Sequence, residues 1–312
     1  MDRGYVQNQY SYKIYGLYIE SNYEIEEFIK VDKVSNYDKV VITKGTISEK
    51  IKELINQGNN FGTSKEEIWF NINNTAIYQI CNGNRIAFEI YENADLDLVK
   101  GYLMCSCLGF IMIQREKLAI HGGCVVINDR GVIITGDRGA GKSTLTTALR
   151  LKGYKFLSDD VAAISDENNA ILVDYGFPYQ KLCVGAMDNF KYESDKYKSI
   201  MGDTEMKYMI PVYDDFIKKN VQLEAIFKLS CEDVDDVYIE EIRGVKKLNS
   251  IISSIYRGEF FRHIEGMSSA YIGKCIEIAK NIKFYKIIRP KNEFSINKQI
   301  KLLENKLNME VK

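Results

Sequence analysis

Alternating apolar and polar positions run through the first third of the chain and predict a small domain built mainly of strands. Such period-two alternation is typical of strands that bury one face of a sheet. Between these strands, Ile47 to Ile55 has apolar residues at helical spacing, with Ser48 available as a cap. Asn73-Asn74 and Asn82-Gly83-Asn84 are natural hairpin connections. The alternating segments are Tyr12 to Tyr18, Lys39 to Thr43, Ile68 to Ile72, Ala76 to Cys81 and Arg85 to Ile90.

The pattern changes at Leu96, where apolar residues begin to occupy nearly every face of a helical projection. Leu96 to Gln114 is therefore predicted to be a long, mostly buried helix. Its longest apolar run, Leu103 to Ile113, is too short to span a bilayer. We expect residues 1–96 to form a strand-rich N-terminal domain with a structural or recognition role, and residues 97–312 to form a larger second domain.

In the second domain, strands and helices alternate, which predicts an α/β fold. The strong turn Asn128-Asp129-Arg130-Gly131 joins two strands, so the sheet must contain antiparallel neighbours and is expected to be mixed. Asp188 to Asp215 has little periodicity and is predicted to be a long surface segment. The predicted strands are Ala119 to Ile127, Gly131 to Thr135, Tyr154 to Leu157, Ala225 to Leu229, Val237 to Ile242 and Phe284 to Ile288, and the predicted helices are Thr144 to Lys152, Val245 to Tyr256, Ser268 to Ile282 and Ile296 to Leu307.

Composition narrows the classes of function. A hydrophobic content of 46% with a net charge of −1 describes a globular chain without the overall field that attracts nucleic acid or an acidic membrane. The seven cysteines have no metal or redox spacing, and two histidines are too few to suggest a zinc site. The N-terminal MDRGYVQNQY has no apolar core typical of a signal peptide. We therefore expect a cytoplasmic protein with reduced thiols.

One motif connects this fold to chemistry. Gly136, Gly141, Lys142 and Ser143 fit G-x-x-x-x-G-K-[ST] between a strand and a helix, which is the context of a phosphate-binding loop. In such a loop, backbone N–H groups surround a phosphate, the lysine bridges the β- and γ-phosphates, and the hydroxyl holds Mg²⁺. The alternative is an ordinary glycine turn. The residues expected to contact the nucleotide are Gly136, Asp137, Arg138, Gly139, Ala140, Gly141, Lys142, Ser143 and Thr144.

Two adjacent acids follow the next predicted strand. Asp159 and Asp160 come directly after Ser158, where carboxylates beside a phosphate-binding loop hold a metal ion or position a nucleophile. Neighbouring side chains in extended backbone point different ways, so one acid can face the metal and the other the acceptor. The alternative is a turn or helix-capping pair, since aspartate favours such positions.

These motifs together resemble a known family. His121-Gly122, then GDRGAGKST, then LSDD are similar to the catalytic core of bacterial HPr kinase/phosphorylase and the wider HPr-kinase-like set. The N-terminal IYGLYIESNYEIEEF resembles the opening of shorter kinases encoded with lasso peptides and other ribosomally made, modified peptides. The resemblance implies a phosphate-loop kinase core of HPr-kinase/PEP-carboxykinase-like type. It also leaves a homo-oligomer open, since HPr kinases form hexamers.

The resemblance further implies ATP, Mg²⁺ and roles for individual residues. Asp159 would be the general base, and Asp160 would lie near the metal together with Ser143. A carboxylate in that place can take the proton of a serine hydroxyl as the bond to phosphorus forms. His121 matches the family histidine beside the phosphates, although a lone histidine often only satisfies a backbone carbonyl. Lys142 completes the catalytic set.

The sequence also departs from HPr kinase. That family has a second signature, L-E-[IV]-R-G, whose glutamate contributes to metal binding. The corresponding region here, Asp174 to Gly185, lacks it, and Ile239 to Gly244, IEEIRG, lies far downstream in what is predicted to be a strand-to-helix junction. The second metal ligand and the reverse phosphorylase reaction therefore stay open.

Other charged residues have weaker assignments. Lys207 is expected to contact phosphate or the acceptor. Arg138 could touch the nucleotide or simply be solvated at the loop tip. Arg289 could reach a ligand, although an ordinary strand end is the preferred interpretation. His263 has no counterpart in the family that we can assign.

These observations predict an ATP- and Mg²⁺-dependent kinase that phosphorylates a Ser/Thr hydroxyl of a peptide or protein, such as a ribosomally made precursor peptide. The N-terminal domain would recognise the peptide by adding it as a strand, by analogy with known modes of recognition. Two alternatives stay open. One is a kinase for a small hydroxyl compound such as free serine, and the other is a nucleotide-binding regulator or assembly factor without transfer activity.

Overall fold

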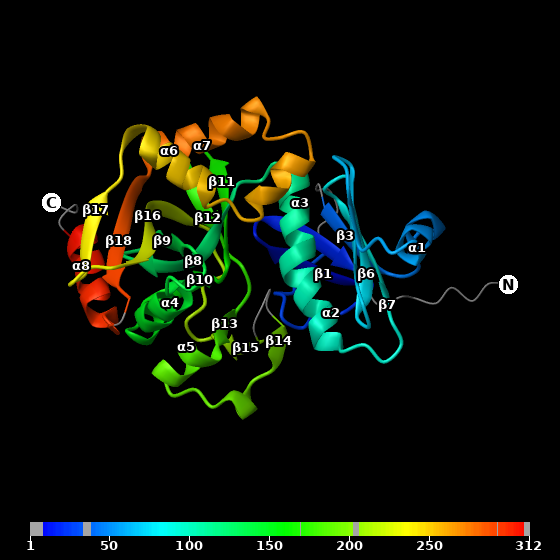
Figure 1. The fold of residues 1–312 in the computed structure, drawn as a ribbon, viewed down its shortest axis with the longest axis horizontal. Coiled ribbons are helices and arrows are strands. Elements are labelled where there is room, and N and C mark those ends of the chain that lie inside the picture. Colours follow the sequence, from blue (N-terminus) through cyan, green and yellow to red (C-terminus); the bar gives the residue numbers. More distant parts are fainter. Residues whose placement is uncertain (1–8, 34–38, 169, 202–205, 292, 309–312) are drawn as a thin grey trace. The chain divides into compact units, whose positions relative to one another are not determined.

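The computed structural model describes residues 9–33, 39–168, 170–201, 206–291 and 293–308. The chain is a mixed α/β protein, as predicted, and forms two compact units (Figure 1). The first contains residues 1–117 and 259–267, and the second contains residues 118–258 and 268–312. The boundary between the compact units thus falls after Lys117, at the end of the helix that begins at Leu96. The domain boundary at residue 96 stays a prediction.

The first unit is built on one seven-stranded sheet in the order β1-β2-β3-β7-β6-β5-β4. The pairs β2–β3 and β3–β7 are parallel and the remaining pairs are antiparallel. Its elements are β1 (Tyr10–Ile14), β2 (Leu17–Ser21), β3 (Lys39–Lys44), α1 (Glu49–Asn56), β4 (Phe61–Thr63), β5 (Glu67–Ile72), β6 (Ala76–Cys81), β7 (Arg85–Ile90), α2 (Leu96–Tyr102), a π-helical turn (Leu103–Cys107) and α3 (Leu108–Gln114).

The strand predictions for β3, β5, β6 and β7 are confirmed, but the first one is wrong. Tyr12 to Tyr18 is not a single strand, because Tyr15 and Gly16 have φ angles of 53° and 71° and turn the chain into a β1–β2 hairpin. Two consecutive residues in the left-handed region make the tight turn that favours hairpins. The aromatic and β-branched residues of this segment are typical of both strands, so the composition gave no sign of the turn between them.

Helices cover both faces of this sheet. Ile51 of α1 belongs to one apolar cluster with Trp69 and Ile77. The next residues along these strands, Phe70 and Tyr78, stack on each other with ring centroids 4.8 Å apart and lie close to aromatic rings of the long helix on the opposite face. Period-two alternation therefore places one set of side chains under α1 and the other under α2 and α3 (Figure 1).

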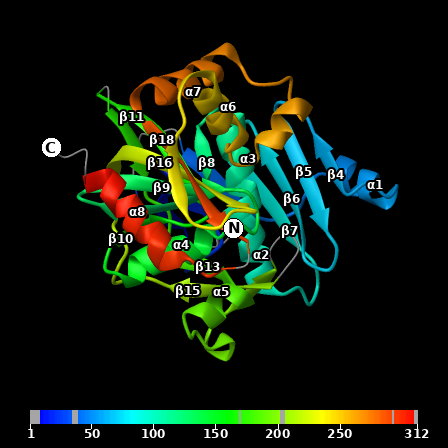
Figure 2. The same ribbon diagram turned by 60° about the vertical axis from the view of Figure 1, so that its left-hand side comes forward.

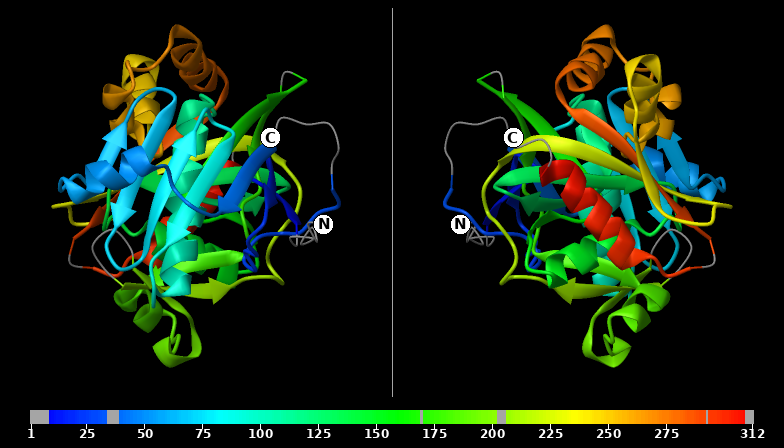
Figure 3. Two further views of the ribbon diagram at one scale, coloured as in Figure 1. Left: turned by 90° about the vertical axis from the view of Figure 1, so that its right-hand side faces the viewer. Right: turned by 90° about the vertical axis from the view of Figure 1, so that its left-hand side faces the viewer.

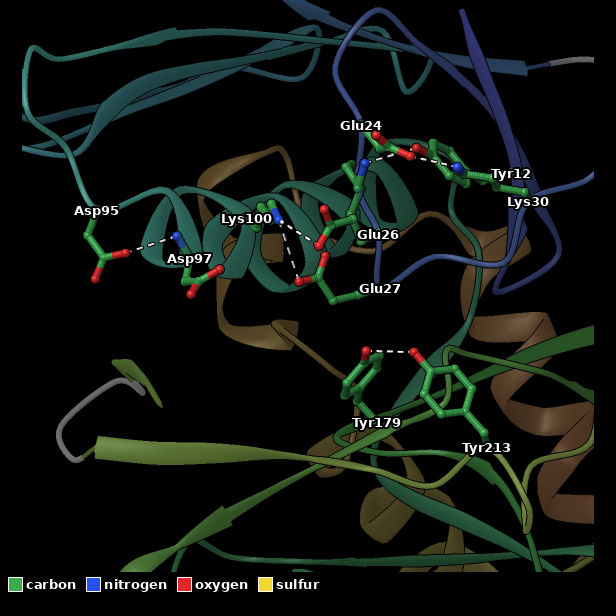
Figure 4. A network of polar contacts seen from close by, with 11 residues as sticks. Tyr12, Glu24, Glu26, Glu27, Lys30, Asp95, Asp97, Lys100, Tyr179 and Tyr213 are labelled. Carbon is green, nitrogen blue, oxygen red and sulfur yellow. Dashed lines mark hydrogen bonds and ion pairs between the residues drawn. The ribbon is translucent and has the colours of Figure 1, made fainter. Parts of the chain in front are cut away.

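The long helix, Leu96–Gln114, is continuous through its π-helical turn, which confirms the predicted element. It has the length and composition to cross a membrane, contrary to the expectation drawn from Leu103 to Ile113 alone, but 67% of its apolar 18-residue window is buried inside the protein, as in a core helix. Asp95 caps its first turn by accepting from Asp97 N at 2.9 Å. Lys100, 9% exposed, forms ion pairs of 3.7 and 3.8 Å with Glu26 and Glu27 (Figure 4).

The second unit contains an eight-stranded mixed sheet. One row of hydrogen-bonded strands has the order β10-β8-β9-β16-β18-β17. The strands β11 and β12 also connect β8 to β16, because β8 pairs with β11, β11 with β12, and β12 with β16. The pairs β9–β16 and β16–β18 are parallel, and the others are antiparallel. The strands are β8 (Ala119–Ile127), β9 (Arg130–Gly136), β10 (Lys155–Ser158), β11 (Val161–Glu167), β12 (Ala170–Asp174), β16 (Val221–Glu232), β17 (Tyr238–Glu241) and β18 (Lys283–Pro290).

Two pairs of helices lie on opposite sides of this sheet (Figures 1 and 2). On one side, α4 and α8 share an apolar core with β9, β16 and β18. Figure 3 shows α8 in front of the sheet in its right-hand view. On the other side, α6 and α7 contact each other. The predictions for these four helices are confirmed within a few residues, with bounds α4 (Lys142–Leu151), α6 (Gly244–Ser253), α7 (Ser269–Asn281) and α8 (Ile296–Asn308).

A small antiparallel sheet, in the order β13-β15-β14, completes the second unit. It corrects the prediction that Asp188 to Asp215 is a long surface segment, because Ile200 and Ile210 are buried there. Residues 202–205 lie outside the described residues. Alternation in such short strands is too brief to distinguish them from a loop. The elements are β13 (Tyr179–Cys183), α5 (Val184–Asn189), a 3₁₀ turn (Ser194–Lys196), β14 (Ser199–Met201) and β15 (Met206–Pro211), and a further 3₁₀ turn spans Gly258–His263.

Candidate active site

The glycine-rich loop connects the end of β9 to the start of α4. Gly136 has a φ of 143°, and a Cβ on it would lie 2.4 Å from the carbonyl oxygen of Leu229 on β16. Only glycine permits so close an approach between the loop and the neighbouring strand. Gly141, with a φ of 105°, precedes the first turn of α4, and no side chain caps that turn. The N–H groups at the start of α4 therefore keep their capacity to bind an anion.

Lys142 is held over this loop. Its ammonium donates hydrogen bonds to the carbonyl oxygens of Gly136 at 2.8 Å and Asp137 at 3.1 Å. Burial lowers the pKa of Lys142, while the carboxylate of Asp160 acts in the opposite direction. A partly desolvated ammonium beside free helical N–H groups forms a compact positive site, which is the electrostatic character that a phosphate group requires.

The two acids follow the end of β10, as predicted, and form the short connection through which the chain path continues into β11. Ser158 of β10 pairs with Cys124 of β8, and Val161 of β11 pairs with His121 of the same strand. Asp159 and Asp160 interrupt this path, where Asp160 has a φ of 41°. The neighbouring positions of β8 pair in turn with the end of β9, beside the glycine-rich loop. With strands about 4.8 Å apart, the acids lie roughly 10 Å from the loop.

Lys181 of β13 joins the two acids. Its backbone N–H donates to Asp159 Oδ2 at 2.9 Å, and its ammonium lies 2.5 Å from Asp160 Oδ2. Its side chain is only 5% exposed. Lys181 was not among the predicted site residues. The only local signal was a lysine within the apolar stretch that precedes α5, where a charge has to find a partner.

Burial and the nearby charges shift the pKa values of Asp159 and Asp160 in opposite directions. Burial, followed by the charge of Asp160, raises the pKa of Asp159 to about 7. Burial also opposes ionisation of Asp160, but the charges of Lys181 and Lys207 outweigh it and hold the pKa of Asp160 below its ordinary value. Near neutral pH Asp159 therefore holds a proton far more readily than an ordinary aspartate does, while Asp160 stays ionised.

His121 is fixed by both its backbone and its ring. Its N–H donates to Ser254 O, its carbonyl oxygen accepts from Thr135 Oγ1, both at 2.7 Å, and its ring lies parallel to that of Tyr256 with centroids 5.7 Å apart. Burial lowers the pKa of the imidazole, although the charge of Asp160 acts to raise it. The imidazole is therefore mainly neutral at pH 7 and adds little positive charge to the site.

These elements surround a cavity of about 480 Å³ in the second unit. This volume lies within the range of small-ligand sites. Gly136, Asp137, Ala140 and Asp159 are not among the lining residues, and Asp159 is only 4% exposed. The predicted site residues that line the cavity are His121, Arg138, Gly139, Gly141, Lys142, Ser143, Thr144 and Asp160, together with Lys207 and Arg289.

Two of the remaining candidates lie outside the cavity, and Arg289 lies in its wall. Ile239 to Gly244 runs from β17 into α6, as predicted, and none of its residues lines this cavity. His263 belongs to the first unit. Arg289, for which both a ligand contact and an ordinary strand end were considered, donates from Nε to Ala140 O at 2.9 Å and so supports the glycine-rich loop.

The donor set fits a nucleotide phosphate and, in part, a magnesium ion. The Ser143 hydroxyl and the Asp160 carboxylate are oxygen ligands in the same cavity. Among the described residues, no group of three His, Cys, Asp or Glu side chains is arranged to hold a metal. Magnesium typically binds through one or two protein oxygens, with water and phosphate oxygens completing its shell, so two donors are compatible with it.

Comparison with known proteins connects this arrangement to one family. Residues 114–181, which include His121, the loop, both acids and Lys181, match the HPr Serine kinase C-terminal domain. The HPr kinase/phosphorylase of Mycoplasmopsis pulmonis is 26% identical over 146 residues, or 45% of this chain and 45% of the relative. That of Shouchella clausii is 40% identical over 60 residues, or 19% of each.

The chain thus spans less than half the length of these curated relatives. A solved structure of the Hpr(Ser) kinase/phosphatase from Coxiella burnetii is similar over 62% of this chain and 99% of that chain, with 19% identity and a TM-score of 0.33. This TM-score is too low to indicate a common fold. The sequence matches support an HPr-kinase-like family, as predicted, and they centre on the segment that builds the site.

Proposed function

We propose that this chain is an HPr-kinase-like phosphotransferase that moves the γ-phosphoryl group of ATP to a hydroxyl group of a protein or peptide, with Mg²⁺ as cofactor. The observation that carries the proposal is the pair Asp159 and Asp160, bridged by Lys181 beside the glycine-rich loop. A carboxyl whose pKa is raised to about 7, next to one whose pKa is held below its ordinary value, is a suitable arrangement for accepting a proton near neutral pH.

Each residue of the site has a distinct task in this reaction. The loop N–H groups and Lys142 hold the phosphates, and Lys207 contributes charge where the acceptor approaches. Ser143 and Asp160 would hold Mg²⁺, which neutralises phosphate charge when bound. The acceptor oxygen forms a bond to the γ-phosphorus as the bond from that phosphorus to the β–γ bridging oxygen breaks, and ADP leaves. The proton of the hydroxyl goes to Asp159.

The position of Asp159 places one demand on this mechanism. Asp160 lines the cavity, whereas Asp159 is buried behind it with Oδ2 bound to Lys181 N. Proton transfer therefore requires the acceptor hydroxyl to enter beside Asp160 and the Asp159 carboxyl to rotate toward it. Catalytic hydrogen bonds commonly tighten only when the substrate is bound. His121 contributes by packing beside Asp160 as a mainly neutral ring.

The acceptor is proposed to be a protein or peptide, because the curated relatives are named as kinases of the protein HPr. For a precursor peptide, recognition by strand addition would use an edge of the first sheet. The outer edge of β1 is already bonded to residues 29–31, through Lys13 N to Ile29 O at 3.3 Å and Val31 N to Ser11 O at 2.9 Å. Strand addition is therefore proposed at the other edge, β4.

The test is transfer from labelled ATP to an HPr-like protein, a precursor peptide or free serine. We expect transfer to one of the macromolecular acceptors, its loss in Asp159→Asn with ATP binding intact, and a large loss of ATP affinity in Lys142→Ala. Transfer only to free serine would assign the protein as a small-molecule kinase. ATP binding without any transfer would favour a regulator, and unchanged affinity in Lys142→Ala would refute the phosphate-loop assignment.

A further inference from the structure

The cavity continues past the glycine-rich loop on the side away from the acids. In the strand order β10-β8-β9-β16-β18, the acids follow β10, the loop follows β9, and Arg289 lies near the end of β18. The β9, β16 and β18 strands are parallel to one another. Because β9 and β10 are both antiparallel to β8, β10 runs in the same direction as these three strands. All these carboxyl ends therefore meet at one edge, where α/β sheets bind their ligands.

The far wall of the cavity is the segment that leads from β18 into α8. Five of its residues line the cavity: Glu293, Phe294, Ser295, Ile296 and Gln299. This wall is attached to the loop in two ways. Arg289 donates to Ala140 O, and Ile296 packs in the same apolar core as Ala140 and Leu145 of the loop and α4. The start of α8 is thus held at a fixed place beside the loop.

Gln299 has an unused hydrogen-bonding group in this wall. Its side chain is only 3% exposed, and its Nε2 donates to Ser295 Oγ at 3.1 Å, which orients the carboxamide. Its Oε1 is buried and has no hydrogen-bond partner in the described part of the chain. Buried polar atoms of native proteins nearly always have partners. An unpaired amide oxygen in the wall of a ligand cavity therefore indicates a donor supplied by the ligand.

Phe294 adds an aromatic surface at the same place. Its side chain is 59% exposed although it lies in the cavity wall, next to the buried Ile296. An exposed aromatic ring beside an apolar residue and a hydrogen-bonding amide is the combination that binds a nucleobase, which stacks by its face and is recognised at its edge. Neither residue belongs to the segment that matches the kinase family.

We propose that the start of α8 is the nucleobase subsite, with Phe294 stacking on the base and Gln299 Oε1 accepting a hydrogen bond from the exocyclic amino group of adenine. The inference rests on the proposed nucleotide-dependent function, which it extends to the choice of nucleotide. Adenine carries an amino donor where guanine carries a carbonyl acceptor. Guanine would place its oxygen against Gln299 Oε1, so the subsite selects ATP over GTP.

Calorimetric titration of the full chain with ATP, GTP and inorganic tripolyphosphate separates the base from the phosphates. We expect Phe294→Ala to weaken ATP binding about tenfold, in keeping with the loss of one stacked base, while tripolyphosphate affinity is unchanged. Gln299→Leu should reduce the preference for ATP over GTP. The matched control is Tyr238→Ala, at an exposed aromatic residue of β17 that does not line the cavity, and should change neither affinity.

Each contrary outcome has a definite meaning. Equal weakening of ATP and tripolyphosphate in Phe294→Ala, or a wild-type protein that binds GTP as tightly as ATP, would overturn the subsite and leave the phosphate loop in place. A wild-type protein that binds neither ATP nor tripolyphosphate would overturn the proposed function together with the subsite. The melting temperature of each variant shows that it is folded before its affinity is interpreted.

Discussion

Replacing Lys181 with methionine should destabilise the protein by about 4 kcal/mol at pH 7. Methionine keeps much of the apolar stem and removes the ammonium that lies 2.5 Å from Asp160. The carboxyl of Asp160, 19% exposed, then either stays ionised without its partner, at a cost of about 3–5 kcal/mol, or takes up a proton. Protonation costs about 1.4 kcal/mol for each pH unit above the ordinary value of 3.8, which is also about 4 kcal/mol at pH 7.

The loss should depend on pH in a definite direction. In the wild-type protein the pKa of Asp160 is held below 3.8, so its stabilising contribution is present above that pH and lost only in stronger acid. In the variant the pKa is raised above 3.8, so stability is lost as the pH rises. The difference between the two proteins should therefore shrink to about 2 kcal/mol at pH 5.

Urea denaturation at pH 5, 6 and 7 measures this difference. Lys286→Met is the matched control, because Lys286 forms a 2.6 Å ion pair with Glu232 in which both side chains are at least 30% exposed. We expect it to cost less than about 1 kcal/mol. The double variant Lys181→Met with Asp160→Asn should recover most of the loss. A loss that does not change with pH, or no recovery in the double variant, would refute the ion-pair argument.

Three further predictions test other parts of the molecule. The transfer rate should rise about tenfold per pH unit up to about pH 7, where Asp159 loses its proton, and a rate that is flat from pH 5 to 7 would argue against Asp159 as base. Gly136→Ala should lower the free energy of unfolding, measured by urea denaturation, by about 3 kcal/mol because its Cβ would meet backbone atoms. Gly139→Ala, where the Cβ would enter open space, should lower it by about 1 kcal/mol because of the positive φ alone. Equal losses in the two variants would contradict this account of the packing. Lys100→Met should cost about 3 kcal/mol in the first unit, and a change under about 0.5 would show that its glutamates need no partner.

Local pattern was sufficient for much of the fold. The hairpins at Asn73-Asn74 and Asn128 to Gly131, the long helix from Leu96 and the four helices of the second unit were all predictable, because each depends on residues close together in the chain. The strand–loop–helix order around Gly136 also follows from a short motif. Short strands such as β14 were not predictable, since three residues contain too little alternation to identify them.

The candidate site was only partly predictable from local sequence pattern. The sequence by itself predicted the glycine-rich loop and the paired acids as site residues, because the chemistry of phosphate transfer restricts residue types at short spacing, and the resemblance to HPr kinase added His121. Only the tertiary structure decided that Lys181 bridges the acids and that Gln299, with a buried and unpaired side-chain oxygen among the described residues, lies in the wall of the same cavity. Lys181 lies on β13 and Gln299 on α8, and their places beside the acids and the loop depend on strand order and burial, which residue spacing does not encode.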